Sequence, residues 1–262
     1  MTLQATTCWT SLRTVAYTSD NDKLFLSKLD DGVYLCNKRQ QPYFFPFLTE
    51  REQAIAKTYL DSICFKQYMF FGGYDAAERK LLGLFFDEDK PFPIAALDFA
   101  FRKSDTLTHR DFLGALMSLG IERETVGDIL VEDGRCVVFV NSEISDYIIS
   151  QIYKVGNVGV KVSVSNTDNL PKGRGFEEKE YTVPSLRLDA VISAVTGLSR
   201  EKSKRIIQMG NVTLNHFDSQ NPSKQAEVKD VLTIRGKGKY VINGVLGETK
   251  KHRIRISIIH YR

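Results

Sequence analysis

The clearest pattern of apolar and polar positions in the chain lies between residues 185 and 215. Apolar side chains recur there at intervals of three and four residues, which predicts a helix whose packing face holds Leu188, Val191, Ile192 and Val195. Ser185 is the expected N-cap, and Gly197 follows the last periodic residues, where glycine often ends a helix. The stretch therefore begins with a short amphipathic helix.

A second amphipathic helix is predicted between Ser199, its expected cap, and Gly210, which suits the left-handed residue that closes a helix. Its packing side should hold Ser203, Ile206, Ile207 and Met209. Its opposite side carries polar and basic side chains, namely Arg200, Lys204, Arg205 and Gln208. A strand beginning at Val212 is expected next. Two such helices feeding a strand have the outline of a small RNA-binding module.

The pattern after residue 215 predicts strands. One holds Leu232 and Ile234, a glycine turn follows at 236–239, and a returning strand begins at Tyr240. In the last strand, alternation places Ile254, Ile256 and Ile258 inward and Arg253, Arg255 and Ser257 outward. We expect the basic residues of the turn and of the last hairpin to extend the basic helix face as one surface. The predicted RNA-binding set beyond that helix is Arg187, Asn215, Arg235, Lys237, Lys239, Lys250, Lys251 and Arg253.

Residues 92–165 show an alternation of their own. A strand at 94–101 and a helix at 109–120 precede two strands at 126–131 and 135–140, a helix at 143–156 and a strand at 158–165. This βαββαβ order is that of a ferredoxin-like plait, the architecture of RRM domains. Phe99 and Phe101 are candidates for base stacking, but the strand at 135–140 offers only Phe139, so stacking and core packing both stay open.

The first 91 residues are expected to form a mixed α/β region. A helix and then a turn are predicted within 24–36, an aromatic loop at 40–47, and a helix that Thr49 opens with Glu52 in a capping box. A strand reaching Gly72-Gly73 should turn into a brief helical stretch before the next strand at 81–86. The fold class is therefore α+β, with an N-terminal region at 1–91, a plait at 92–165, a polar linker at 166–184 and the basic module at 185–262.

Charge divides the chain in the same way. The formal net charge is +4, but residues 185–262 hold 15 Lys and Arg against 6 Asp and Glu, a charge of +9 that leaves −5 for the first 184 residues. A polyanion is the natural partner of a basic module, because each phosphate that Lys or Arg neutralises releases a condensed counterion. The acidic first part argues against general binding to anionic surfaces.

Composition limits the remaining classes of function. There is no apolar run near the length of a membrane span and no secretory signal, so we expect a cytoplasmic protein without a membrane partner. Cys8, Cys36, Cys64 and Cys136 are scattered thiols that suit a reducing compartment, and the four histidines make no metal-ligand spacing with them. The pair Gly72-Gly73 lacks the Lys-Ser/Thr ending of a nucleotide-binding loop. No metal and no cofactor are therefore expected.

The residues of the basic module resemble the S4 RNA-binding domain. The likeness rests on the order and spacing of Arg187-Leu188-Asp189, Ser199-Arg200, Ile206-Ile207, Gly210-Asn211-Val212 and Asn215. That family has two helices against a small antiparallel sheet, and its basic second helix grips structured RNA. This sequence departs from the pattern at Lys229-Asp230, where Gly-Asp is more frequent.

From about residue 45 to its end, the chain is similar to the YlmH family of bacterial proteins. The likeness rests on Gly72-Gly73-Tyr74, Ala77-Glu78-Arg79, the run at 109–121, Gly127-Asp128-Ile129, Arg235-Gly236-Lys237-Gly238 and Thr249-Lys250-Lys251. The resemblance implies a non-catalytic RNA-binding protein on the large ribosomal subunit, with rRNA and tRNA as partners. We expect the protein to be a monomer. It also implies a part in the rescue of stalled nascent chains and, by older naming, in cell division.

Two alternatives come from other classes. Asp189 lies in an Arg-Leu-Asp motif like that of the pseudouridine synthase nucleophile, but only 73 residues follow it, too few for the large catalytic domain of those enzymes. A methyltransferase would need a Gly-rich cofactor loop after a strand, and the first 184 residues show no convincing one. We therefore expect Asp189 to cap its helix or pair with a basic neighbour. The other alternative is a protein-binding scaffold for cell division in which the basic module is secondary.

Overall fold

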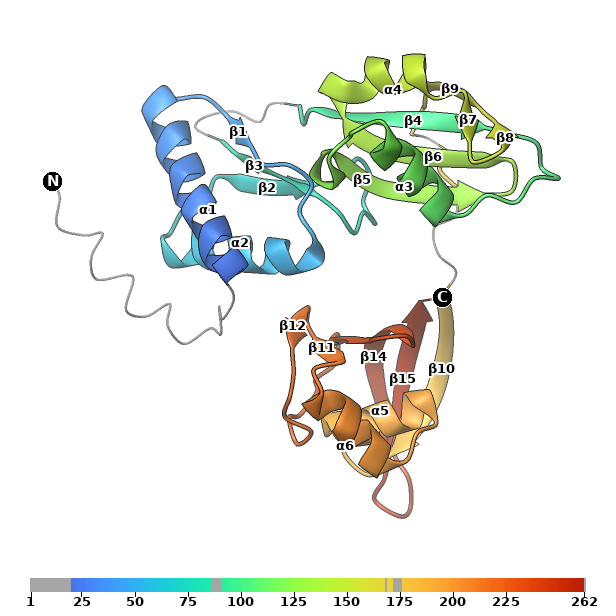
Figure 1. Ribbon diagram of the computed structural model, residues 1–262. Helices are drawn as coiled ribbons and strands as arrows, with labels where there is room; N and C mark the ends of the chain where they lie inside the picture. The colour runs from blue at the N-terminus through green and yellow to red at the C-terminus, as the bar shows by residue number, and fades with distance from the viewer. Residues whose placement is uncertain (1–19, 86–90, 168, 172–175, 262) are drawn as a thin grey trace, which may run out of the picture. The chain divides into compact units, whose positions relative to one another are not determined.

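The computed structural model describes residues 20–85, 91–167, 169–171 and 176–261. The chain divides into two compact units, Met1–Gly173 and Arg174–Arg262 (Figure 1). Cys8 and part of the predicted linker lie outside the described residues. Mixed α+β structure with antiparallel sheets, the expected fold class, is present in both units. No helix in the described ranges combines the length and apolar character that a membrane span requires.

The first unit begins with two helices and a small sheet. Its elements are α1 (Asp20–Arg39), β1 (Tyr43–Phe44), α2 (Glu50–Ser62), β2 (Tyr68–Phe71) and β3 (Leu81–Leu84), and the antiparallel sheet has the order β1-β3-β2. The capping box predicted at Thr49 is confirmed, with both reciprocal bonds to Glu52 present. The helix and turn predicted at 24–36 are instead one continuous helix, and the Phe45 ring packs directly against it at Gly32.

The second part of the first unit has a four-stranded antiparallel sheet, ordered β5-β6-β4-β9. Its elements are β4 (Ile94–Ala100), α3 (His109–Ser118), η2 (Arg123–Thr125), β5 (Val126–Glu132), β6 (Arg135–Asn141), η3 (Ser142–Ile144), α4 (Ser145–Gln151) and β9 (Lys161–Val164). The strands and helices predicted here are present in the predicted order. The second helix is shorter than expected, because a two-stranded hairpin of β7 (Lys154–Val155) and β8 (Val158–Gly159) follows it.

A polar joint and a shared apolar core connect these two sheets. The Asp128 carboxylate on β5 accepts hydrogen bonds from the Tyr74 hydroxyl (2.9 Å) and from the backbone N–H groups of Glu78 (2.7 Å) and Arg79 (3.1 Å). These contacts replace the brief helix that was predicted after Gly73, since the segment between β2 and β3 contains only turns, bends and a bridge. Apolar side chains from both sheets pack beside this joint, namely Phe47, Leu81, Ala96, Leu130, Val137 and Phe139.

The second unit places two helices on a six-stranded antiparallel sheet, ordered β10-β15-β14-β13-β11-β12. Its elements are β10 (Phe176–Val183), α5 (Leu188–Thr196), α6 (Arg200–Gln208), β11 (Val212–Leu214), β12 (Phe217–Asp218), β13 (Val231–Ile234), β14 (Gly238–Glu248) and β15 (Ile254–Tyr261). The prediction that residues 176–183 belong to a linker was wrong. They pair along their whole length with β15, and Val183 is buried in the core of this unit.

Candidate nucleic-acid interface

Two arginines of the predicted set converge on one buried carboxylate at the start of α5. The Asp189 side chain is 0% exposed. Its Oδ1 accepts from Arg187 Nε (3.2 Å), and its Oδ2 accepts from Arg200 Nη2 (2.9 Å). Burial by itself raises the pKa of Asp189, but the hydrogen bonds and charges of the two arginines outweigh it and hold this pKa below its ordinary value. The expectation that Asp189 pairs with basic neighbours is confirmed.

The start of α5 differs from the prediction in its cap. Arg187, and not Ser185, is the N-cap residue. A loop supplies the acceptors that the first turn needs, because Leu188 N–H donates to the Lys224 carbonyl (2.9 Å) and Asp189 N–H donates to the Pro222 carbonyl (3.0 Å). This loop is 33 or more residues away in sequence, so local pattern did not indicate it. At the other end, the expected Gly197 closes the helix in the left-handed region.

Helix α6 presents its basic side chains to solvent as predicted. The Ser199 side chain caps it by accepting from Lys202 N–H (3.3 Å), and Ser203 and Ile207 are buried. Arg200 and Lys204 have side chains 49% and 42% exposed, and Arg205 and Gln208 are exposed too. Met209, which was predicted to pack, is 71% exposed, because the helix ends at Gln208 and Met209 is its C-cap.

The basic turn between β13 and β14 lies next to the end of α6. Arg235 N–H donates to the carbonyl of Asn211, three residues after the end of the helix (3.0 Å). Two contacts hold the turn: the Lys237 carbonyl accepts from the Tyr240 hydroxyl (3.0 Å), and the Tyr240 ring stacks on His260 at 4.3 Å. Gly238 has a φ of 103°, and a side chain there would press against His260. Arg235 and Lys237 are exposed on this turn.

Two further members of the predicted set have structural partners. Lys239 Nζ lies 5.5 Å from the centre of the Tyr261 ring, a cation–π distance. Asn215 adopts a φ of 50°, its Nδ2 donates to Asp230 (2.8 Å), and its Oδ1 accepts from Val231 N–H (2.9 Å). The Asn215 amide therefore holds the connection between β11 and β13.

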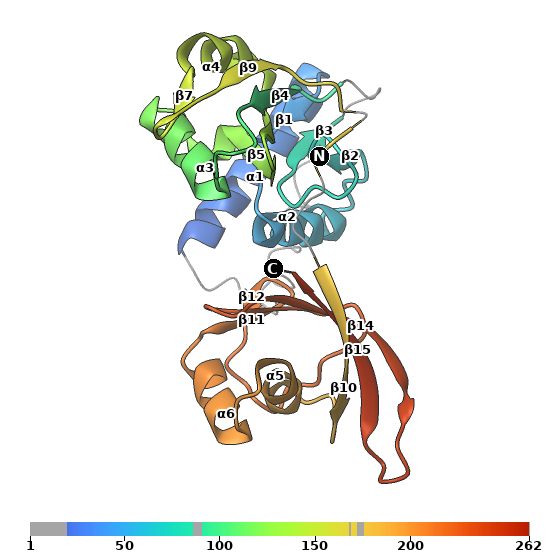
Figure 2. The ribbon, with the colours of Figure 1, turned by 90° about the vertical axis from the view of Figure 1, so that its right-hand side faces the viewer.

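The basic hairpin tip is distant from the β13–β14 turn. Lys250, Lys251 and Arg253 lie beyond the far end of β14, which runs for 11 residues from Gly238 to Glu248. At about 3.3 Å per residue, the two ends of this strand are roughly 30 to 35 Å apart. Figure 2 shows β14 and β15 running past the helices to this tip. The structure does not bring the tip and the turn into one cluster, as the alternation alone had suggested. Ser257 also differs, because its hydroxyl is buried and donates to Glu178 on β10.

Two aromatic side chains of the middle sheet, Phe99 and Phe139, are not open to a ligand. Phe99 is 1% exposed and packs against Phe112, with ring centres 5.6 Å apart. Phe139 is 0% exposed and stacks on Tyr74 at 5.0 Å, so the N-terminal region covers its face of the sheet. Phe101 is half-buried against Phe112 as well. Of the two alternatives left open for these rings, Phe99 and Phe139 therefore serve core packing.

Within the described ranges, no group of three or more His, Cys, Asp or Glu side chains is arranged to hold a metal ion. Among the described cysteines, Cys36 and Cys136 are buried and Cys64 is exposed. The basic surface of the second unit is therefore the strongest site that the sequence predicted. It has two parts, which we call the helix–turn set (Arg187, Arg200, Lys204, Arg205, Gln208, Arg235, Lys237 and Lys239) and the hairpin-tip set (Lys250, Lys251 and Arg253).

Comparison with known proteins agrees with the resemblance. Residues 88–169 match the family "Putative RNA-binding domain in YlmH". The chain is 33% identical over 245 residues to "Ribosome-associated protein quality control protein P2" of Bacillus subtilis, covering 90% of this chain and 94% of that protein. A solved structure, "Cell division protein ylmH from Streptococcus pneumoniae", is 23% identical, with a TM-score of 0.49 over 56% of this chain and 93% of that one. The identity and coverage of the Bacillus relative show that the chain belongs to the YlmH family.

Proposed function

We propose that the chain is a non-catalytic protein that binds structured RNA on the ribosome, at the large subunit, with rRNA and tRNA as its partners. The family match to an RNA-binding domain and the ribosome-associated relative support this proposal. The observation that carries it is the exposed basic face of α6, whose first arginine is held by a buried carboxylate. A fixed guanidinium loses less conformational entropy when it binds phosphate than a free one.

We also propose fold assignments for the two parts that this function uses. Residues 92–165 form a ferredoxin-like plait, and residues 185–262 form an S4 domain. The first is supported by the strand order β5-β6-β4-β9, in which the outer strands follow the two helices. The second is supported by α5 and α6 packing on an antiparallel sheet, with Val191, Ile192 and Ile207 in its core.

The proposed mechanism is electrostatic capture by the helix–turn set. Phosphate contacts fix the orientation of a protein on a nucleic acid without reading its sequence. If about five phosphates are neutralised, the affinity should fall with salt at a log–log slope of roughly −3.5 to −4.5. Arg187 and Arg200 can take part although they bind Asp189, because each guanidinium has five N–H donors and is partly exposed.

The environment of Asp189 favours a binding role over catalysis. A carboxylate nucleophile must reach a substrate atom, whereas both oxygens of Asp189 accept from arginines and its side chain is 0% exposed. A pseudouridine synthase-like reaction would require this carboxylate to leave both partners. We therefore assign Asp189 to the positioning of Arg187 and Arg200.

Two double variants with the same change in charge test the helix–turn assignment. Each removes two positive charges: Lys204→Ala with Arg205→Ala on α6, and Lys250→Ala with Lys251→Ala on the hairpin tip. The assay is binding of the full chain to purified large ribosomal subunits over a series of salt concentrations. We expect the α6 variant to weaken binding and to reduce the magnitude of the salt slope by about 1.4 to 1.8. Unchanged affinity and slope in the α6 variant would show that this face does not bind RNA.

A further inference from the structure

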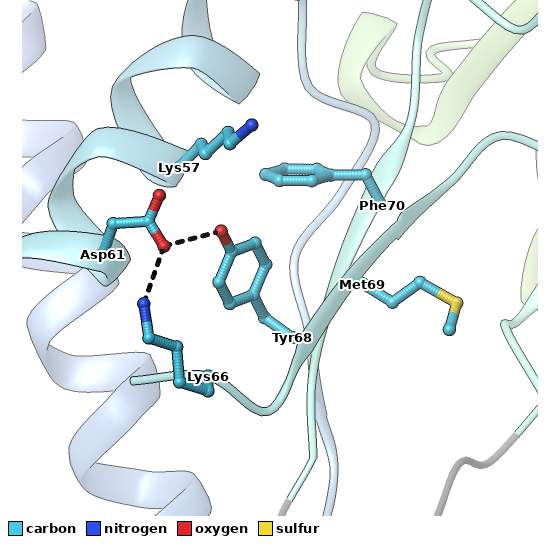
Figure 3. A pocket seen from close by; sticks show the side chains of 6 residues that line it. All are labelled: Lys57, Asp61, Lys66, Tyr68, Met69 and Phe70. Carbon is cyan, nitrogen blue, oxygen red and sulfur yellow. Dashed lines mark hydrogen bonds and ion pairs between the residues drawn. The ribbon is translucent and has the colours of Figure 1, made fainter. Parts of the chain in front are cut away.

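The edge strand of the N-terminal sheet borders a pocket that the RNA-binding proposal does not use. Strand β2 pairs with β3 on one side and, among the described residues, has no strand on its other side. A pocket of about 460 Å³ opens between this edge and α2, lined by Lys57, Asp61, Lys66, Tyr68, Met69 and Phe70. Figure 3 shows Tyr68 and Phe70 pointing toward α2, while Met69 points away.

The register of β2 determines which of its backbone groups are free. Phe85 N–H donates to the Gln67 carbonyl (2.8 Å), so Gln67 and Phe85 form a hydrogen-bonded pair. Hydrogen-bonded pairs alternate in an antiparallel ladder, so Met69 directs its N–H and C=O toward β3, while Tyr68 and Phe70 direct theirs outward. Within the described part of the chain, no backbone partner meets these outward groups.

The side chains beside this edge combine apolar rings with one unpaired positive charge. Asp61 is engaged twice, because it accepts from the Tyr68 hydroxyl (3.2 Å) and pairs with Lys66 (3.4 Å). The side chain of Lys57, one turn before Asp61 on α2, has no ion-pair or hydrogen-bond partner among the residues that the structure describes (Figure 3). A ligand beside β2 would therefore meet the Tyr68 and Phe70 rings and the Lys57 ammonium.

We propose that the edge of β2 and the adjoining pocket bind an extended peptide segment of a protein partner by strand addition. Its backbone would pair with the outward N–H and C=O groups of Tyr68 and Phe70. Of two successive side chains facing α2, one apolar residue would pack on the rings and one acidic residue would pair with Lys57. RNA has no alternating N–H and C=O groups to match a strand edge, so the backbone pattern favours a peptide. This inference is independent of RNA binding by the second unit.

A short edge with nearby lysines also has a simpler interpretation, protection against edge-to-edge aggregation. An edge strand that only avoids aggregation does not require an adjoining pocket, and β2 has one. This pocket offers a cavity beside the strand, and its lining includes Lys57, which has no counter-ion within the described ranges of the chain. Protection and peptide binding differ in a measurable way, because only binding orders the amides of Tyr68 and Phe70.

The test uses the full chain and a defined probe. The probe is a fluorescein-labelled heptapeptide, Ser-Thr-Val-Thr-Glu-Thr-Ser, with blocked ends, which places Val and Glu on one face of a strand. Binding is measured by fluorescence anisotropy, and hydrogen exchange is followed at the amides of residues 67–71. We expect saturable binding that slows exchange at Tyr68 and Phe70, and no binding by the same peptide with N-methyl groups on its central amides.

The role of Lys57 is tested by charge reversal with a matched control. Lys57→Glu should weaken peptide binding about five- to tenfold, since it replaces an exposed ion pair with a repulsion. Lys28→Glu makes the same change at another exposed lysine of the N-terminal region and should leave the affinity unchanged. Absence of binding up to millimolar peptide, or binding without protection at Tyr68 and Phe70, would overturn the proposal. Lys57-dependent binding of a labelled uridine hexanucleotide in place of the peptide would overturn it in favour of RNA.

Discussion

Replacing Asp189 with Asn tests the central arrangement of the basic unit. The substitution keeps the shape of the side chain but removes the charge that both Arg187 and Arg200 contact. One amide oxygen remains as an acceptor, while the new NH₂ group faces a guanidinium that cannot accept a hydrogen bond. The variant therefore loses at least one charge-assisted bond and leaves a buried donor without a suitable acceptor.

The expected cost is about 2 to 3 kcal/mol, since a hydrogen bond to a charged group contributes about 1.5 to 3 kcal/mol and the buried amide adds to its loss. It stays below the roughly 3 to 5 kcal/mol for breaking a fully buried pair. The reason is that the side chains of Arg187 and Arg200 are 34% and 49% exposed and can turn to water. Arg187 also keeps its bond to the Ser223 hydroxyl (2.7 Å).

Native-state hydrogen exchange of the α5 amides is a suitable assay, because it reports local opening and does not require a chain with two units to unfold in one step. A loss of about 2 to 3 kcal/mol should speed exchange at Ile192 by about 30- to 140-fold. The control Glu201→Gln alters a carboxylate on α6 that is 82% exposed and 3.9 Å from Lys204, so it should change exchange little.

The stabilising contribution of Asp189 should depend on pH in a defined direction. Because the folded-state pKa of Asp189 is depressed, its stabilising contribution is present above the unfolded pKa of about 3.9 and is lost as the pH falls through the folded value. The difference in opening free energy between wild type and Asp189→Asn should therefore shrink below about pH 4. A variant that exchanges like wild type at neutral pH would refute the claim that the carboxylate organises these arginines.

Two further predictions concern the first unit. A side chain at Gly127 would lie 2.6 Å from the Phe47 ring, so Gly127→Ala should destabilise the joint between the sheets by about 1 to 3 kcal/mol. Gly114 on α3 has open space around it, so Gly114→Ala should stabilise the protein by about 0.5 to 1 kcal/mol. Thermal unfolding measures both changes. Iodoacetamide should label the exposed Cys64 in the folded protein and reach Cys136 only after unfolding. The reason is that burial shields the Cys136 thiol and raises its pKa. Peptide mass spectrometry would show the order of labelling.

Sequence pattern predicted those features that neighbouring residues determine. The helices α5 and α6 follow from apolar spacing, and their ends at Gly197 and Ser199 follow from the backbone freedom of glycine and from a serine side chain that reaches the next turn. The capping box at Thr49 is local in the same sense, since its partner is three residues away. These features could be predicted from the sequence because the interacting residues of each lie within one or two helical turns.

The features that were predicted wrongly depend on residues distant in sequence. Residues 176–183 are polar and follow a Gly- and Pro-rich stretch, so they were interpreted as a linker, but β15 pairs with them from 71 or more residues away. The role of Phe139 stayed open for the same reason, because an aromatic side chain on a central strand suits both base stacking and packing, and its partner Tyr74 is distant in sequence. The pocket beside β2 was missed for a related reason, because it requires the edge position of that strand.

The basic residues were identified from the sequence, but their division into two sets was not, because it depends on the length and pairing of β14. Arg235 lies beside the end of α6 through its bond to Asn211, whereas Lys250 and Lys251 lie one long strand away. These two sets are roughly 30 to 35 Å apart along β14. A single compact phosphate cluster cannot reach both sets at once. An RNA that contacts both sets must therefore span that distance, either as one extended helix or as separate segments.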